Sequence, residues 1–142
     1  MKSEMIAPCG INCAICVAYF GFTKSGAKRK HTCSGCRSRN KEGGEKLLQR
    51  EKCAFLKKHC ELLANDKVRF CFECTEYPCA HLRKLDDRYR KNYNMSMIEN
   101  LNFIRDRGMK KFLHAQSKKY QCPSCGGTIC VHTNRCYNCS IP

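Results

Sequence analysis

Hydrophobic residues recur at three- and four-residue intervals between residues 81 and 119, and this spacing predicts helices rather than strands. The first helix is expected over residues 78–93. This range begins with a proline, which suits the first turn of a helix because the backbone N–H that proline lacks would have no partner there. Leu82, Leu85 and Tyr89 then fall on one face, so the helix is predicted to bury one side.

Two more helices are predicted to follow. Ser96 and Glu99 have the spacing of a capping box, in which side chains satisfy the unpaired backbone groups of the first turn, and this helix is expected to run to residue 106. Gly108 is expected to break the helical pattern. A third helix over residues 109–118 would turn two side chains inward, those of Phe112 and Leu113.

The pattern is weaker outside this half of the chain. Residues 14–22 are mostly apolar and predict a short buried helix, whereas residues 54–65 alternate apolar residues with lysines as an amphipathic helix does. Residues 23–44 are rich in Lys, Arg, Ser and Gly and are expected to form a loop. Near the C-terminus, residues 128–133 suit a short strand.

The composition shows that a hydrophobic core alone does not explain the fold. Leu, Ile, Val and Phe make up only 26 of 142 residues and the formal net charge is +15, a combination that ordinarily indicates disorder. The chain also contains 15 cysteines. Because a structural zinc ion contributes about 10–16 kcal/mol to folding, bound metal can replace the missing core.

Disulfides are the alternative to metal. The cysteine count is odd, many cysteines come in C-x2-C pairs, and residues 1–10 lack the apolar segment of a secretory signal. We therefore expect reduced thiols and a cytoplasmic protein. Association with a membrane is not expected, because the longest mostly apolar run, residues 14–22, is too short to span one.

The strongest motif lies near the C-terminus and has the spacing C-x2-C-x10-C-x2-C. Two residues between cysteines let the chain turn back so that both sulfurs reach one ion, and two such knuckles complete a tetrahedral zinc site. A Cys-Pro-x-Cys-Gly knuckle also occurs in iron-binding rubredoxin-type sites, so iron is the alternative metal. Cys130 and His132 lie between the knuckles and are expected to be structural. The predicted ligands of this zinc ribbon are Cys122, Cys125, Cys136 and Cys139.

The ten cysteines of the first 80 residues predict further sites, for a total of two to three zinc ions per chain. The simplest division in chain order assigns Cys33, Cys36, Cys53 and Cys60 to one site. His59 and His81 lie beside possible ligands and are expected to be solvated. The other site would draw four ligands from six cysteines whose pairing the spacing does not fix: Cys9, Cys13, Cys16, Cys71, Cys74 and Cys79.

These cysteines lie in segments that resemble a known family. The segments are Cys-Gly-Ile-Asn-Cys-Ala-Ile-Cys from residue 9, Cys-Ser-Gly-Cys-Arg from residue 33, and Cys-Phe-Glu-Cys-Thr-Glu-Tyr-Pro-Cys from residue 71. In this order they resemble the prokaryotic domain-of-unknown-function family 3795 over about residues 5–90. The resemblance implies a small cysteine-rich, zinc-binding protein and supplies no catalytic residue. The C-terminal ribbon would be an addition to that core.

The residues favour a structural-zinc protein that acts as a binding or adaptor module over an enzyme. A closed four-sulfur zinc site has no open position for water. No Ser–His–acid, paired-carboxylate or phosphate-loop pattern occurs, and Asp86 and Asp87 lie among arginines, where surface ion pairs are expected. The partner would be a protein or a nucleic acid.

Two alternative functions stay open. Cys9, Cys13 and Cys16 have the spacing of the radical-SAM motif, but the chain is too short for that class of barrel, so a simpler iron–sulfur cluster is the alternative cofactor. Nucleic-acid binding is the other alternative. The residues that suggest it are aromatic side chains that could stack on bases and a basic segment after them: Tyr19, Phe20, Phe22, Lys24, Lys28, Arg29, Lys30, His31, Arg37, Arg39 and Lys41.

The sequence as a whole predicts a small metal-stapled α+β fold. Residues 1–119 are expected to form a mainly helical cysteine-rich domain with zinc knuckles. Residues 120–142 are expected to form a zinc ribbon. Three four-cysteine zinc sites would lower the formal charge from +15 to about +9, so part of the basic excess would neutralise thiolates rather than attract a polyanion.

Overall fold

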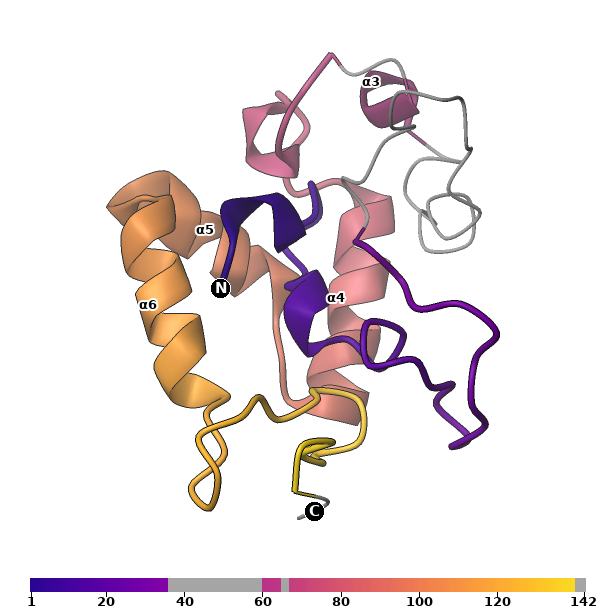
Figure 1. Cartoon of the computed structure of the whole chain (residues 1–142). Helices are drawn as coiled ribbons and strands as arrows, with labels where there is room; N and C mark the ends of the chain where they lie inside the picture. The colour runs from indigo at the N-terminus through magenta and orange to yellow at the C-terminus, as the bar shows by residue number, and fades with distance from the viewer. Residues whose placement is uncertain (36–59, 65–66, 140–142) are drawn as a thin grey trace, which may run out of the picture.

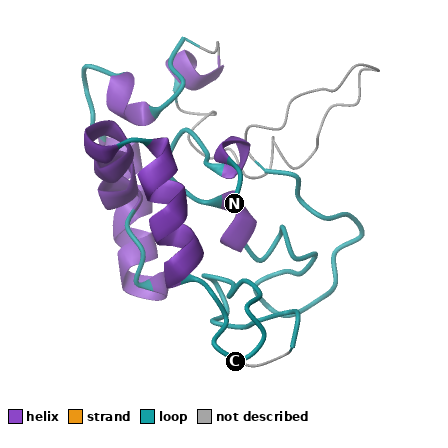
Figure 2. Ribbon diagram, turned by 60° about the vertical axis from the view of Figure 1, so that its left-hand side comes forward, coloured by secondary structure: helices purple, strands orange, loops and turns teal. Residues whose placement is uncertain are grey.

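The computed structural model describes residues 1–35, 60–64 and 67–139, and the regular structure in these ranges is helical. Three helices lie together in one half of the molecule, and loops from both ends of the chain form the other half (Figures 1 and 2). The β structure in the described ranges consists of isolated bridges. None of the described helices is both long and apolar enough to cross a membrane.

The three long helices confirm the predicted pattern. Helix α4 (Ala80–Tyr93) begins two residues later than expected, with Cys79 as its N-cap. Helix α5 (Met97–Arg107) has Ser96 as its N-cap, and the Ser96 hydroxyl accepts a hydrogen bond of 3.0 Å from the Glu99 N–H. Gly108 separates this helix from α6 (Met109–Lys119) at a φ of 90°, a conformation that glycine adopts without strain.

Short helical turns occur in addition to the three long helices. They are η1 (Ser3–Met5), η2 (Cys13–Ile15), α3 (Glu61–Ala64) and η3 (Cys71–Glu73). Helix α3 falls within the amphipathic helix predicted over residues 54–65, whose residues 54–59 and 65 lie outside the described ranges.

Two sequence predictions of regular structure are wrong. The helix over residues 14–22 is replaced by η2 and irregular turns, because its backbone groups bond to the loop that follows: Gly21 O accepts from Arg29 N–H at 2.8 Å, and Ala18 O accepts from Cys33 N–H at 2.9 Å. The strand over residues 128–133 is reduced to two antiparallel bridges, one on each of its first two residues. Residues 131–133 instead form a turn.

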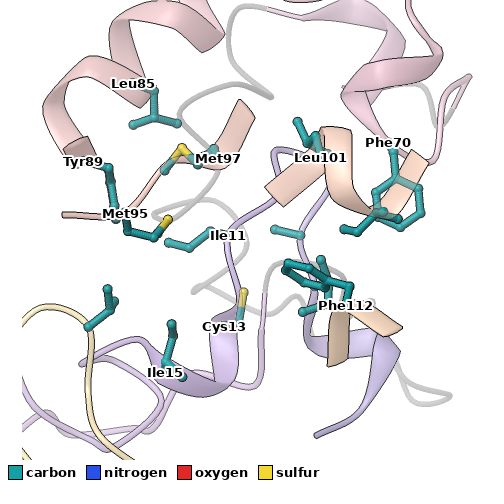
Figure 3. Close-up of a cluster of buried hydrophobic side chains, with 14 of the residues drawn as sticks. Ile11, Cys13, Ile15, Phe70, Leu85, Tyr89, Met95, Met97, Leu101 and Phe112 are labelled. Atoms are coloured by element: carbon teal, nitrogen blue, oxygen red, sulfur yellow. The ribbon is translucent and has the colours of Figure 1, made fainter. Parts of the chain in front are cut away.

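The hydrophobic core forms where the N-terminal loop passes between the helices (Figure 3). In this core Ile11 lies beside Met95, and the same cluster contains Leu101 of α5, Leu85 of α4 and Phe112 of α6. The sequence expectation that Phe112 turns inward is confirmed. Few aliphatic residues are needed because methionine, tyrosine and cysteine side chains fill much of the remaining volume.

Asp86 lies in this interior, so its predicted place at the surface is wrong, although the predicted ion pair with an arginine is present, with Arg90. The residue is 2% exposed, and its carboxylate accepts hydrogen bonds from the Arg90 Nε (2.6 Å), the Ser96 hydroxyl (2.8 Å) and the Ile98 N–H (3.0 Å). Burial raises the pKa of Asp86, but the three hydrogen bonds outweigh it and hold the pKa below its ordinary value. The carboxylate therefore joins α4 to the first turn of α5.

Candidate metal centre

Four cysteines gather in the C-terminal loops and form the C-terminal cluster. All four sulfurs lie within 4.8 Å of one another. The Sγ atoms of Cys122 and Cys139 are 3.6 Å apart, and those of Cys125 and Cys136 are 3.5 Å apart. Sulfurs at the corners of a tetrahedron around one zinc, with bonds of about 2.3 Å, stand about 3.8 Å apart. The ligands that the sequence predicted for this site, Cys122, Cys125, Cys136 and Cys139, are therefore brought together at metal-binding distances.

Backbone N–H groups of both knuckles point at these sulfurs. Hydrogen bonds from the N–H groups of Cys125 and Ser124 lower the pKa of the Cys122 thiol to about 7. The pKa of the Cys136 thiol is also lowered, and the largest cause is a hydrogen bond from the N–H of Cys139. Hydrogen bonds to the charged form favour it, so the chain itself promotes the thiolates that a metal ion requires.

Two glycines shape the first knuckle. Gly126 has a φ of 75°, a conformation that glycine adopts without strain. Gly127 donates its N–H to the Cys125 Sγ at 3.3 Å, and a Cβ there would lie only 3.2 Å from that sulfur and 3.3 Å from the Cys136 Sγ. This second role was not predicted from the sequence, although the Cys-Gly-Gly signal is present there.

The donor set of the C-terminal cluster fits a single ion held by four thiolates. None of the cysteines in the described ranges forms a disulfide, and the sulfur separations far exceed the S–S bond length of about 2.05 Å. Four soft ligands at tetrahedral spacing suit zinc or a single iron. With all four positions taken by protein, a bound ion would have no site for water or substrate.

The loop between the knuckles attaches the C-terminal cluster to the rest of the molecule. Cys130 is fully buried, as expected for a structural residue. The Val131 N–H donates to the Ile15 carbonyl at 2.9 Å. His132 accepts a hydrogen bond of 3.2 Å from the Val17 N–H through Nδ1, and its Nε2 lies 3.0 Å from the Tyr89 hydroxyl. The cluster is therefore tied both to the N-terminal loop and to α4.

A comparison with known protein families identifies the family to which the N-terminal part of the chain is similar. The model for the protein of unknown function family DUF3795 matches residues 5–84. The chain belongs to the DUF3795 family. The match ends before Cys122, so the C-terminal cluster lies outside the matched region. The comparisons with curated proteins and with solved structures gave no match.

Within the DUF3795 region, the structure separates the cysteines by position. Cys13 and Cys33 are buried near each other: the Gly35 N–H donates to the Cys33 Sγ at 3.4 Å, and a Cβ at Gly35 would lie 3.7 Å from that of Cys13. Cys16 and Cys74 are half-buried. Four others are half-buried, and each packs against the hydrophobic core: Cys9, Cys60, Cys71 and Cys79.

Not every predicted ligand of the DUF3795 region can be placed. Cys36, Cys53 and His59 lie outside the described residues, and His81 is exposed on α4. Among the residues that the structure describes, the C-terminal cluster is the one group with at least three possible ligand atoms within 4.8 Å of one another. The division of the N-terminal cysteines into sites therefore stays a prediction.

Of the three aromatic residues considered for base stacking, Phe20 and Phe22 stack on another ring, whereas Tyr19 is exposed. Tyr137, between the last two cysteines, stacks on Phe22 with ring centroids 4.7 Å apart and on Phe20 at 5.1 Å. The ammonium of Lys24, from the predicted basic segment, lies 5.0 Å from the ring centre of Tyr93. The stacking on Tyr137 joins the C-terminal loops to the N-terminal loop, and the Lys24 contact joins the N-terminal loop to α4.

Proposed function

We propose that this member of the DUF3795 family is a metal-binding protein in which the C-terminal cluster holds one structural zinc ion. The ion fixes the two knuckles and, through the loop between them, the attachment to α4 and the N-terminal loop. The protein would act as a binding or adaptor module, because a closed four-sulfur site leaves no coordination position for a reaction.

The convergence of four sulfurs carries this proposal. The C-terminal loops have little regular structure of their own: in the described residues it is limited to isolated bridges, and Cys125 is exposed to solvent. Without an ion, four thiols at this spacing would gain little from one another. With an ion, they form strong bonds that offset the cost of ordering the loops.

Zinc is proposed over iron on the basis of affinity. A divalent site with these ligands binds Zn²⁺ more tightly than Fe²⁺ in the usual order of first-row metals. Zinc also has no geometric preference of its own, so it accepts the tetrahedral arrangement that the knuckles impose. A single iron on the same four sulfurs is the alternative, and it would be recognised by its colour.

The experiment is a measurement of metal content on the full chain purified without oxygen. Cys125→Ser removes a solvent-exposed ligand and is expected to lose one ion per chain. Ser124→Ala changes the neighbouring exposed residue, which supplies no ligand, and is expected to keep it. Equal metal content in the two variants would overturn the proposal. Zinc without visible absorption supports the proposed metal, whereas iron with charge-transfer bands would replace it.

A further inference from the structure

A second group of thiols lies away from the C-terminal cluster, where the N-terminal loop meets the segment before α4. The Cys71 N–H donates to the carbonyl of Pro8 at 2.9 Å, which places Cys71 directly beside Cys9. From Cys71 the chain turns twice, through bonds from Cys74 N–H to Cys71 O (3.2 Å) and from Tyr77 N–H to Cys74 O (3.1 Å). It then reaches Cys79, the N-cap of α4.

Packing distinguishes four of the cysteines in this region from the fifth. Cys9, Cys60, Cys71 and Cys79 are all half-buried and all contact the same hydrophobic core. Cys74 is also half-buried, but it is not among the side chains that pack against that core. The four core-packed cysteines, which we call the Cys71 cluster, come from three separate stretches of the chain.

The electrostatics of Cys71 agree with this grouping. The pKa of the Cys71 thiol is raised well above its ordinary value, first by burial and then by the thiols of Cys9, Cys79, Cys60 and Cys74, in decreasing order. Cys74 has the weakest of these four effects on the pKa of Cys71. Repulsion among neighbouring thiolates is removed when a cation binds between them.

We propose that Cys9, Cys60, Cys71 and Cys79 hold a second metal centre, separate from the C-terminal cluster. This inference deepens the proposed metal-binding function and assigns Cys60 to the segment of Cys71, not to that of Cys33. It also selects Cys71 without Cys74 from the C-x2-C pair. Burial against the core would protect the centre from water and would connect the N-terminal loop to the start of α4.

The centre would hold a soft metal on four thiolates. Both a zinc ion and an iron–sulfur cluster bind to such ligands. No three sulfurs of the Cys71 cluster lie within 4.8 Å of one another, in contrast to the C-terminal cluster. A single zinc ion would draw these sulfurs closer together. In an iron–sulfur cluster the cysteines bind different iron atoms, so their sulfurs stand farther apart than those around one zinc. The proposed ligands are these four cysteines whether the centre is a zinc ion or an iron–sulfur cluster.

The test compares Cys71→Ser with Cys74→Ser in the full chain purified without oxygen. Metal, acid-labile sulfide and the visible spectrum are measured for both variants and for the wild type. Wild type and Cys74→Ser are expected to hold both centres, and Cys71→Ser is expected to lose one centre. Iron with sulfide and colour identifies a cluster, and colourless protein with a second zinc identifies a single ion. Loss of the same metal in Cys74→Ser would overturn the assignment.

A second measurement covers the case in which Cys71→Ser does not fold. Brief alkylation of the wild-type protein, followed by mass mapping, is expected to label Cys74 before the four cysteines of the cluster. A chelator should make those four reactive together. Labelling of the four at the rate of Cys74, with no effect of the chelator, would show that they are packed side chains without a metal.

The outcome for the C-terminal cluster is read independently, with Cys125→Ser. If the wild type holds only the metal that Cys125→Ser removes, the second centre is refuted and the proposed function stands. If Cys71→Ser loses metal but Cys125→Ser does not, the second centre stands and the C-terminal site is refuted.

Discussion

At the scale of single residues, the close approach of the N-terminal loop to α5 depends on Gly10. A Cβ at this position would lie 2.6 Å from the Met97 carbonyl oxygen and 2.8 Å from the Leu101 Cγ. The backbone there has a φ of 91°, and the Gly10 carbonyl accepts a 2.9 Å hydrogen bond from the Asn100 side chain. The Cys-Gly pair of the N-terminal motif therefore fits only with glycine at its second position.

Gly10→Ala should lower the free energy of unfolding by about 2 kcal/mol or more, because it combines a strained φ with a clash against helix backbone. Gly26→Ala is the matched control. Its φ is 95°, but nothing lies within 4 Å of a Cβ at that position, so only the conformational cost should appear. Thermal unfolding of both variants measures the difference. Equal losses would show that the contact with α5 does not constrain residue 10.

Asp86 is predicted to make stability depend on pH. Because its folded-state pKa lies below the ordinary value, its contribution is complete above about pH 4 and is lost as the pH falls further toward the lowered value. Asp86→Asn should cost about 1–3 kcal/mol at neutral pH by weakening the buried hydrogen bonds. The difference in stability between this variant and the wild type should shrink in acid.

The control for this prediction is Asp87→Asn, one residue along α4 and exposed. Urea unfolding of the three proteins at neutral pH and at pH 3.5 gives the comparison. Since all three carry the same cysteines, any release of metal in acid affects them alike. An Asp86→Asn protein as stable as the Asp87→Asn protein at neutral pH would contradict the account of the buried carboxylate.

At the scale of elements, His132 connects the C-terminal loops to two other parts of the chain. Because Nδ1 accepts from the Val17 N–H, the neutral ring carries its proton on Nε2 and donates it to the Tyr89 hydroxyl. The ring also packs edge-on against Tyr93, with centroids 4.7 Å apart. One side chain thus holds three segments together.

His132→Phe keeps a ring at this position but removes both hydrogen bonds, leaving a backbone N–H without its partner. We expect a loss of about 1–3 kcal/mol and faster hydrogen exchange at the Val17 amide. His114→Phe, at an exposed position on α6, should change neither. An unchanged exchange rate at Val17 in His132→Phe would show that the histidine does not attach the C-terminal loops.

The elements differ in how far the sequence could predict them. Helices α4, α5 and α6 were predictable because their signals are local: side-chain spacing, the Ser96 cap and the Gly108 break. The helix expected over residues 14–22 failed because its backbone bonds to the loop that follows it, and the spacing of apolar residues does not reveal such bonds. The burial of Asp86 was missed for the same reason, since two of its partners lie beyond the end of α4.

The candidate site shows the same division. The C-terminal cluster was predictable from spacing alone, because two knuckles within 18 residues bring all four sulfurs together through local turns. The cysteines of the DUF3795 region come from separate stretches, and their grouping depends on contacts such as that between Cys71 and Pro8. Sequence spacing identified these cysteines as candidate ligands but could not assign them to sites.

At the scale of the whole molecule, removal of metal should destabilise the whole fold and not only the C-terminal loops. The aliphatic core is small, and the loops of both chain ends rely on the C-terminal attachment. A chelator should lower the melting temperature of the wild type markedly and dampen the near-ultraviolet signal of its tyrosines. Zinc added back should restore both. A melting curve unchanged by the chelator would show that bound metal does not stabilise the fold.

The central claim is that a closed, all-sulfur shell surrounds the metal. X-ray absorption at the metal edge of the intact, anaerobically purified protein tests it most directly, because it reports the ligand atoms and their distances. We predict a shell of four sulfurs at about 2.3 Å and no nitrogen or oxygen ligand. A shell containing nitrogen or oxygen, or purified protein without bound metal, would contradict the account.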